Sequence, residues 1–378
     1  MRGIADAFEG MGPLLPLGPG GKQPAALERW SPFGPRGWLA ALPSNAAALV
    51  ATSGSSGDPK LVLLSAEALQ ASGTATHARL FGPGKWLLAL PPHHIAGLQV
   101  VARSVLAGTK PAVVPPGPFT AEAFVAAAEP LEKSSLPTYV SLVPTQLMRL
   151  LQDDAACRTL ATFAAVLVGG AALPEAVAAA AAERKINIVH TYGMSETAGG
   201  CVYDGVALDG AQWKLAADGR ISLAGPMLAE AYLGRPELTA EVFTTDADGR
   251  WFHTFDYGKE VDGKLRVLGR IDDVIISGGV NLEPVTIEDA LIAHAAVSEA
   301  VVVGVSDPHW GQRVVALVVA AESNITLPEM QELVRNRLGS AAVPKQIFIV
   351  DELPTLDSGK IDRAAALRVA NSLCFPTS

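Results

Sequence analysis

The chain has 378 residues, of which 49% are hydrophobic and 18% charged, and its formal net charge is −9. A chain of this length can bury a substantial core and predicts two domains rather than one. The negative charge argues against general binding to nucleic acid or to anionic membranes. The three cysteines, Cys157, Cys201 and Cys374, are widely spaced and show no metal-binding spacing, so we expect a protein of the reducing cytoplasm.

The N-terminal stretch predicts neither export nor membrane insertion. It carries Asp6 and Glu9 where a secretory signal would be apolar. No apolar run in the chain reaches membrane-spanning length without glycine, proline or charge. Residues 11–43 are rich in glycine and proline, which indicates an irregular lead-in.

Residues 52–60 read Thr-Ser-Gly-Ser-Ser-Gly-Asp-Pro-Lys and lie between two apolar runs, 47–51 and 61–64, which predict a hairpin with this loop at its tip. The glycines allow close approach of backbone N–H groups to a ligand, and Lys60 adds a cation, so a polyphosphate is the natural guest. A Walker-type P-loop is excluded, because Lys60 follows Pro59 and precedes a strand-like run instead of opening a helix. From these residues alone, a plain surface loop remains an alternative.

Helical and strand-like segments alternate after this loop. Ser65 is a good N-cap for a helix over 66–80, and a strand over 86–90 leads to His93 and His94, at a strand end where α/β proteins place ligands. Further helices are expected at 95–107, 120–133, 144–153 and after Pro174, and further strands at 112–114, 139–143, 164–168 and 186–190. This rhythm predicts an α/β fold with a parallel sheet and nucleotide-sized clefts at the strand ends.

Residues 203–268 predict a small β-rich subdomain, because helical periodicity gives way to short strands and turns. An Asp-Gly hairpin is expected at 261–265, and Asp256 before it is interpreted as a turn former. We place the domain boundary at the charged stretch that begins at Gly269, so that the domains are 1–269 and 270–378. The second is expected to be α+β, with helices at 284–294 and 329–338 and strands at 300–305, 314–320 and 346–350.

Five segments stand in one order along the chain: TSGSSGDPK, VGGAALP, TYGMSETAGG, GRIDDVIISGG and LPTLDSGKIDR. In this order they resemble the adenylate-forming superfamily of acyl-CoA synthetases, peptide-synthetase adenylation domains and luciferases, from about Ala47 to the end. LPPHHIAGLQV and ETAGGCVYDGVALDG are most similar to the o-succinylbenzoate–CoA ligase family of menaquinone biosynthesis, in its short actinobacterial form. The resemblance implies a large domain of sheets flanked by helices with a β-rich subdomain, and then a small mobile α+β domain that carries the hinge, the CoA loop and the catalytic lysine.

The resemblance also implies a two-step, AMP-forming reaction. A carboxylate attacks the α-phosphate of ATP to give acyl-AMP and diphosphate, and the CoA thiolate then displaces AMP. ATP, CoA and an aromatic dicarboxylic acid are the implied substrates, Mg²⁺ is the implied cofactor, and a homodimer is possible. An AMP-forming acid–CoA ligase is therefore expected.

Matching the motifs residue by residue assigns roles to particular positions, still as implications of the resemblance. The ATP-binding set is Thr52, Ser53, Gly54, Ser55, Ser56, Gly57, Lys60, Gly170, Ala171, Thr191, Tyr192, Gly193, Met194, Ser195, Asp256 and Arg270. Within it Tyr192 stacks on adenine and Asp256 accepts from the ribose hydroxyls. Catalysis falls to Lys360, Glu196 as the Mg²⁺ ligand, and His94, and the acyl substrate contacts His94, Gly169, Gly193, Thr197 and Ala198. Ser277, Gly278 and Gly279 line the CoA path, and Asp272 is the hinge.

The sequence departs from the family pattern in three places. Ser56 replaces the commoner threonine and Phe255 replaces a glycine before the ribose aspartate. The region before the phosphate loop is much shorter than in most relatives, so part of the N-terminal subdomain is expected to be missing, and the dimer contacts that this part supplies in relatives are not assumed for this chain. Three alternatives stay open: another aryl- or acyl-acid–CoA ligase, an adenylation domain that loads a carrier protein, and an inactive adenylate-binding protein.

Overall fold

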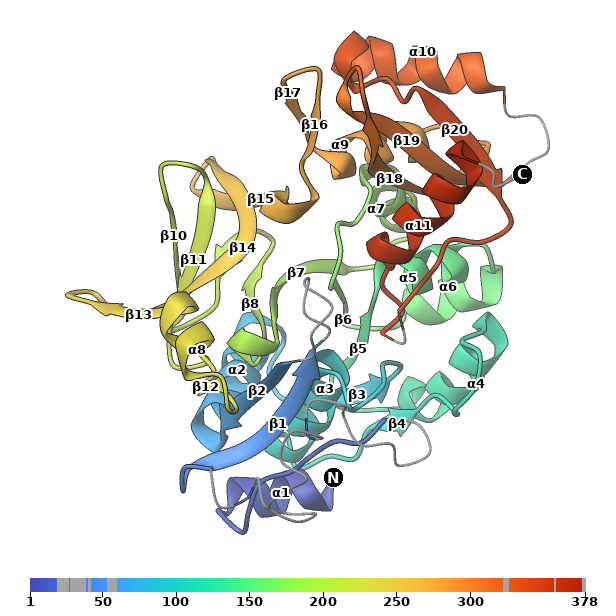
Figure 1. The fold of residues 1–378 in the computed structure, drawn as a ribbon. Helices are drawn as coiled ribbons and strands as arrows, with labels where there is room; N and C mark the ends of the chain where they lie inside the picture. Colours follow the sequence, from blue (N-terminus) through green and yellow to red (C-terminus); the bar gives the residue numbers. More distant parts are fainter. Residues whose placement is uncertain are drawn as a thin grey trace. The chain divides into compact units, whose positions relative to one another are not determined.

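The computed structural model describes residues 1–18, 27, 39, 42–52, 60–321, 326–356 and 358–375. The chain divides into two compact units, each described by itself (Figure 1). The large unit comprises Met1–Gly170, Ala182–Thr254 and Glu260–Leu265, and the small unit comprises Ala171–Ala181, Phe255–Lys259 and Arg266–Ser378. Among the described residues, no helix is both long and apolar enough to cross a membrane.

A seven-stranded sheet forms the centre of the large unit, in the order β4-β3-β5-β6-β7-β8-β9. Its strands are β3 (Lys85–Leu88), β4 (Ala112–Val113), β5 (Thr138–Leu142), β6 (Ala165–Gly169), β7 (Ile188–Met194), β8 (Gly199–Tyr203) and β9 (Val206–Ala207). Neighbouring strands from β4 to β7 are parallel, which confirms the predicted parallel sheet. The two remaining strands, β8 and β9, extend it antiparallel.

The large unit contains the helices α1 (Arg2–Phe8), α2 (Ala66–Arg79), α3 (Ile95–Leu106), α4 (Ala121–Glu132), α5 (Pro144–Leu151) and α6 (Asp154–Leu160), of which α1 and α6 were not expected from the sequence. Helices α2 to α5 pack against this sheet, whereas α1 contacts α2 and α3, and α6 contacts α4 and α5. Val100 of α3 joins Trp86, Tyr139 and Leu167 of the sheet in one buried cluster. The predicted cap of α2 is confirmed, because Ser65 Oγ accepts from the Ala68 N–H at 3.2 Å.

Two further sheets of the chain carry the phosphate loop and the β-rich subdomain. The first has the order β1-β2-β12, with β1 (Ala46–Thr52), β2 (Lys60–Ser65) and β12 (Ala231–Tyr232). The second consists of β10 (Gln212–Leu215), β11 (Arg220–Ala224), β13 (Phe243–Asp246), β14 (Gly249–Val261) and β15 (Lys264–Arg270), accompanied by α8 (Pro236–Val242). The predicted Asp-Gly hairpin joins β14 to β15, and the positive φ angles of Asp262 (51°) and Gly263 (74°) fit a type I′ turn.

The small unit contains a further sheet covered by helices, which is the α+β arrangement that the sequence predicts. Its sheet contains β16 (Ile275–Ser277), β17 (Val280–Leu282), β18 (Val297–Asp307), β19 (Gly311–Ala320) and β20 (Gln346–Val350). Its helices are α9 (Pro284–Ile292), α10 (Leu327–Leu338) and α11 (Arg363–Cys374), and α7 (Glu175–Glu183) lies partly within it. The η5 turn spans Ile271–Asp273.

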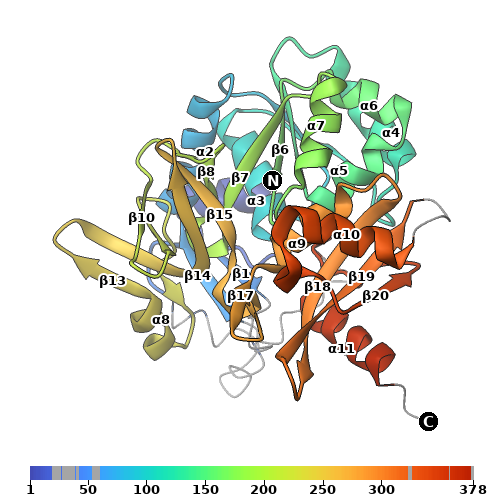
Figure 2. The same cartoon turned by 90° about the horizontal axis from the view of Figure 1, so that it is seen from above.

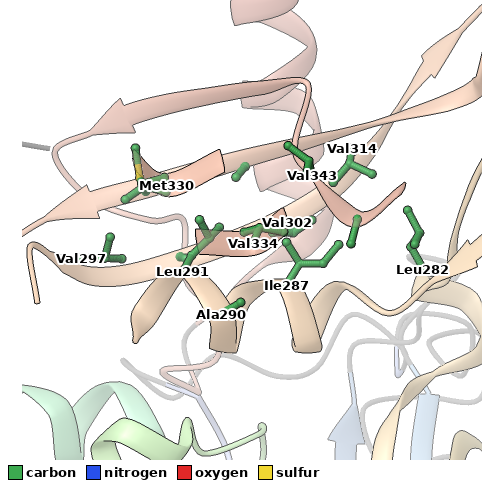
Figure 3. Close-up of a cluster of buried hydrophobic side chains, with 14 of the residues drawn as sticks. Leu282, Ile287, Ala290, Leu291, Val297, Val302, Val314, Met330, Val334 and Val343 are labelled. Carbon is green, nitrogen blue, oxygen red and sulfur yellow. The ribbon is translucent and has the colours of Figure 1, made fainter. Parts of the chain in front are cut away.

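Side chains alternate between the two faces along the long strands of this sheet. Both faces are apolar, and helices cover each of them. Val302 and Val314 pack with Ile287 of α9 and Val334 of α10 (Figure 3). The other face packs against α11, where Val301, Val303 and Leu317 meet Ala366 and Ala370. Figure 2 shows α9 and α10 on one side of the sheet and α11 on the other. This packing holds in place the sheet and α11, to which the loops with the predicted CoA-binding and catalytic residues are connected.

Candidate functional site

The predicted phosphate-loop hairpin is present in the large unit. Strands β1 and β2 pair antiparallel, and Thr52 lies directly opposite Lys60. Ser53, Gly54, Ser55, Ser56 and Gly57, the expected loop residues between them, lie outside the described residues. At the base of the loop, Lys60 Nζ lies 5.1 Å from the centroid of the Tyr232 ring.

Glu196 lies in a 3-10 turn, η4 (Ser195–Thr197), directly after β7. The Tyr232 hydroxyl donates to Glu196 Oε1 at 2.7 Å, and the Ala229 N–H donates to the Glu196 carbonyl at 2.8 Å. Burial, with the Glu196 carboxylate beside it, raises the pKa of Tyr232, so its hydroxyl stays a donor at neutral pH. The segment around Tyr232 therefore brings together the predicted phosphate cation Lys60 and the predicted metal ligand Glu196.

Strand β7 runs through most of the TYGMSET motif, so the expectation that the strand ended at His190 was wrong. The strand continues to Met194 because β8 pairs with it, Thr191 facing Tyr203 and Tyr192 facing Val202. Gly193 belongs to the same strand, and a Cβ there would collide with the Gly199 carbonyl. This crowding is a physical reason for glycine at a predicted ligand-binding position.

The end of β6 lies beside β7. A Cβ at Gly169 would collide with the Thr191 hydroxyl oxygen, so only glycine allows the two strands to approach this closely. Gly170 follows with φ of 85°, in the left-handed region, and it is exposed, as is Ala171. Gly169 and Thr191 are thus brought together, and Gly170 leaves the sheet at its carboxyl edge.

His94 is the N-cap residue of α3, and the centroid of its ring lies 4.3 Å from the centroid of the His93 ring. The start of α3 is tied to the acyl-substrate candidates through Gln99, whose Nε2 donates to the Ala198 carbonyl at 2.6 Å. Ala198 ends the η4 turn with φ of 47°. The structure therefore connects the helix that His94 begins with the turn that Ala198 ends.

Thr197 has a structural task that the sequence did not indicate. Its side chain is fully buried. Its hydroxyl accepts from the Met194 N–H at 2.9 Å and lies 2.7 Å from the Gly199 carbonyl. The side chain of Thr197 thus holds the turn around Glu196 closed, while Ser195, the first residue of the turn, is also buried.

Asp256 and Arg270 are brought together in the small unit. Asp256 lies inside β14, so its interpretation as a turn residue was wrong: the strand continues through Phe255 and Asp256 to the Asp-Gly turn. Its Oδ1 lies 3.6 Å from Arg270 Nη1, and the second guanidinium nitrogen lies 3.3 Å from Asp272 Oδ2. Arg270 therefore links the predicted ribose carboxylate to the predicted hinge residue.

The predicted CoA loop is the tip of a two-residue hairpin. Ser277 at the end of β16 pairs with Val280 of β17, and Gly278 and Gly279 between them have φ of 57° and 80°. The Gly278 N–H donates to the Trp310 carbonyl at 2.9 Å, and a Cβ at Gly278 would press on the Trp310 ring. A Gly-Gly pair between two short strand-like runs is a typical sequence signal for such a turn, and it could have predicted this hairpin.

Lys360 lies exposed in a short loop of the small unit. The Leu356 N–H donates to its carbonyl at 2.8 Å, and a bridge joins Thr355 to Ile361, while Asp357 lies outside the described residues. The loop is anchored by Arg363, which begins α11. Its guanidinium donates to both oxygens of Glu288, at 2.7 and 2.8 Å.

Arg363 also reaches the residue beside the predicted hinge. Its Nε lies 3.4 Å from Asp273 Oδ2 in the η5 turn. Burial raises the pKa of Asp273, and the neighbouring Arg363 opposes that rise. No short sequence pattern indicates this connection, since the partners come from separate segments.

Comparison with known proteins gives a consistent result. The family model "AMP-binding enzyme" matches residues 27–236, and "AMP-binding enzyme C-terminal domain" matches residues 286–360. A probable 2-succinylbenzoate–CoA ligase of Mycobacterium tuberculosis is 43% identical, over 85% of this chain and 84% of that one. The 2-succinylbenzoate–CoA ligase of Listeria innocua is 36% identical, over 85% of this chain and 69% of that one. Among solved structures, the Bacillus subtilis o-succinylbenzoate CoA synthetase in complex with its acyl-adenylate intermediate has a TM-score of 0.73 at 28% identity, covering 88% and 70% of the two chains.

Proposed function

Because the chain belongs to the AMP-binding enzyme family, we propose that it is an AMP-forming 2-succinylbenzoate–CoA ligase. It converts ATP, 2-succinylbenzoate and CoA into 2-succinylbenzoyl-CoA, AMP and diphosphate, a step of menaquinone biosynthesis as the sequence resemblance implies. The observation that carries the proposal is the 43% identity to the mycobacterial ligase over 85% of this chain. We also propose that the enzyme works in the cytoplasm and forms a homodimer.

The reaction consists of two displacements. In the first, a carboxylate oxygen of the acid attacks the α-phosphorus of ATP, the bond to the bridging oxygen breaks, and diphosphate leaves. In the second, the CoA thiolate attacks the acyl carbon and AMP leaves. The attacking carboxylate and the phosphates are all anions, so the first step needs positive charge at the reacting phosphate. Lys60 and the N–H groups of the Thr52–Lys60 loop would hold the phosphates, and Lys360 would bridge the carboxylate and the α-phosphate.

Glu196 is the residue that fits a Mg²⁺ ion bound together with ATP. A carboxylate offers about four acceptor sites, so the hydrogen bond from Tyr232 to Oε1 leaves Glu196 with lone pairs that can bind a metal. The described residues contain no group of three or more His, Cys, Asp or Glu side chains placed to hold a metal. Mg²⁺ usually binds through one or two carboxylates, water and substrate phosphates, so a single carboxylate beside ATP could serve as its protein ligand. When bound, the ion would neutralise phosphate charge.

The adenosine part of ATP would be held by motif residues that follow the phosphate loop in the chain. Tyr192 of β7 would stack on adenine, bordered by Gly170 and Ala171, and the backbone of Thr191 to Ser195 would contribute to the same site. Asp256 would accept hydrogen bonds from the ribose hydroxyls, and the arginine 3.6 Å from it, Arg270, would donate to ribose or phosphate. The chemistry supports the carboxylate role, since a carboxylate is a natural acceptor for a diol.

The acid and CoA would use two other sets of residues. The acid would lie against residues from the start of α3, from β6 and β7, and from the η4 turn and its C-cap: His94, Gly169, Gly193, Thr197 and Ala198. The hairpin tip Ser277–Gly279 would border the pantetheine chain. Its two glycines carry no side chains, which allows a narrow thiol chain to approach the backbone.

Diphosphate release with a panel of acids tests the proposed function. We expect release to depend on Mg²⁺ and to be fastest with 2-succinylbenzoate, when kcat/KM is compared with benzoate, other aryl acids and fatty acids. A far higher kcat/KM for another acid would overturn the substrate and leave the reaction class. Release without thioester formation from CoA would favour a carrier-loading adenylation domain, and no release with any acid would indicate an inactive adenylate-binding protein.

A further inference from the structure

Tyr232 lies where two predicted parts of the ATP site meet in the large unit. Its strand, β12, pairs antiparallel with β2, Tyr232 facing Val62, so it runs beside the strand that Lys60 begins. Three residues before it, the Ala229 N–H donates to the Glu196 carbonyl at 2.8 Å. Backbone hydrogen bonds therefore join this segment both to the phosphate-loop strand and to the turn that carries Glu196.

The Tyr232 side chain makes the same two connections. Its hydroxyl donates to Glu196 Oε1 at 2.7 Å, and Lys60 Nζ lies 5.1 Å from its ring centroid. The side chain is held firmly, because only 3% of the residue is exposed and its ring packs edge-on against Phe243. Its own N–H donates to Thr239 Oγ1 at 3.0 Å, which fixes the backbone as well. Few rotamers are open to a tyrosine held in this way.

We propose that Tyr232 is a positioning residue for the Mg·ATP site, holding the Glu196 carboxylate with its hydroxyl and facing Lys60 with its ring. The inference rests on the proposed function, because it gives Glu196 and Lys60 their tasks. A metal-binding carboxylate is oriented by the group that donates to it, and loss of such a partner costs about 10- to 100-fold in metal affinity or activity. Tyr232 thereby sets the direction in which the carboxylate presents its remaining lone pairs.

A purely structural role for Tyr232 makes a different prediction. Buried tyrosines usually find some acceptor for their hydroxyl, and in that case Glu196 would be only a convenient one. Removing the hydroxyl would then lower stability without changing how the protein binds a metal. Tyr203 provides the matched control, because it is also fully buried and its hydroxyl is also bonded, to Thr76 Oγ1 at 2.9 Å and from Arg103 Nη2 at 3.2 Å.

The test compares Tyr232→Phe with Tyr203→Phe in the full chain. Mn²⁺ binding is measured by electron paramagnetic resonance in the presence of ATP and without any acid, and the Mg²⁺ concentration for half-maximal diphosphate release is measured with the acid. We expect Tyr232→Phe to weaken Mn²⁺ binding and to raise the Mg²⁺ requirement by about 10-fold or more. We expect Tyr203→Phe to change neither by more than about 2-fold, even if it melts at a lower temperature.

A double variant adds a second readout. If Tyr232 acts through Glu196, then adding Tyr232→Phe to Glu196→Gln should cause little further loss of Mn²⁺ binding, because contacting residues are not additive. Equal Mn²⁺ binding by Tyr232→Phe and the unchanged protein would overturn the inference while leaving the proposed function in place. An unchanged protein that binds Mn²⁺ with ATP but releases no diphosphate with any acid would overturn the proposed function instead.

Discussion

Glu196 is both a proposed metal ligand and the acceptor for a buried hydroxyl, and these two tasks can be separated. Glu196→Ala removes the carboxylate and leaves the Tyr232 hydroxyl without its acceptor. An unsatisfied buried donor costs about 1–3 kcal/mol of folding free energy. Glu196→Gln keeps an oxygen that can accept the bond but loses the charge that Mg²⁺ prefers.

We therefore expect both Glu196 variants to need much more Mg²⁺ for diphosphate release and only Glu196→Ala to lose stability, by about 1–3 kcal/mol. Denaturant unfolding followed alongside Mg²⁺ titration measures the two effects. Unchanged Mg²⁺ dependence in both variants would remove Glu196 from the metal site. Equal unfolding free energies for the two variants would mean that the Tyr232 bond contributes nothing to the fold.

Arg363 presents a similar case in the small unit, where one residue holds a loop in place. Its side chain is 25% exposed and that of Glu288, to which it is doubly bonded, is 10% exposed. Burial opposes the positive charge of Arg363, but the carboxylates of Glu288 and Asp273 together more than compensate, so the pKa of Arg363 is raised. Glu288 Oε1 also accepts from the Val302 N–H at 2.8 Å, which ties the pair to β18.

Arg363→Met should lower the free energy of unfolding by about 3–5 kcal/mol, because it leaves the buried carboxylate of Glu288 without its partner. Arg335→Met is the matched control, since Arg335 pairs with Glu332 on α10 with both side chains about half exposed. Exposed pairs contribute about 0–1 kcal/mol. Denaturant unfolding measures the free energy of unfolding of both variants. Similar losses of this free energy in the two variants would show that the Arg363 pair is no stronger than a surface pair.

Whole elements were predicted well where a local pattern determines them. Ser65 caps α2 because a side-chain oxygen satisfies a helix N–H locally, and the Asp262-Gly263 pair forms its turn because both residues accept positive φ. Errors arose where pairing with a distant strand decides: β7 continues to Met194 because β8 pairs with it.

In the candidate site, too, residues in local motifs were assigned from the sequence, whereas residues with distant partners were not. Motif residues such as Glu196 were assigned their proposed roles from short segments that resemble family motifs. Tyr232 and Arg363 were not assigned any role, since their partners come from distant segments and no short pattern links them. The long-range contacts that position the site residues are therefore the part of the site that a single sequence does not predict.

Helix α9 gives a prediction about pH. Burial, together with the nearby carboxylates of Glu288 and Glu175, raises the pKa of Asp289 to about 7, although Arg266 opposes the rise. In the unfolded chain an aspartate has a pKa of about 3.9. Between about pH 4 and 7 the folded state therefore binds more protons than the unfolded state, so this group makes stability fall as pH rises through that range.

Asp289→Asn should remove this dependence, because an asparagine does not ionise. The variant should melt at a higher temperature than the unchanged protein at pH 8, and the difference should shrink towards pH 5. Thermal unfolding at pH 5, 6, 7 and 8 measures it. Parallel melting curves across that range would contradict a raised pKa for Asp289.

At the scale of the whole molecule, the proposed reaction uses residues from both units. The phosphate-loop strands and Glu196 belong to the large unit, while Lys360, Gly278 and Gly279 belong to the small unit. In the proposed reaction, adenylation would need Lys360 at the α-phosphate, and thioester formation would need the glycine hairpin beside CoA. Because these two segments of the small unit would each be needed in a different half-reaction, we predict that the small unit rotates about Asp272 between the half-reactions.

Assaying the half-reactions separately tests this alternation. Lys360→Ala should slow acyl-AMP formation by about 10²–10³-fold, as loss of one group that stabilises a developing charge does, and leave CoA transfer from supplied acyl-AMP largely intact. Asp272→Pro should do the reverse if it holds the first orientation, because proline fixes φ near −65° at the proposed pivot. Arg335→Met, on the exposed face of α10, should change neither rate. Equal loss of both half-reactions in each variant would contradict alternation and would leave Lys360 as a residue needed for binding or structure alone.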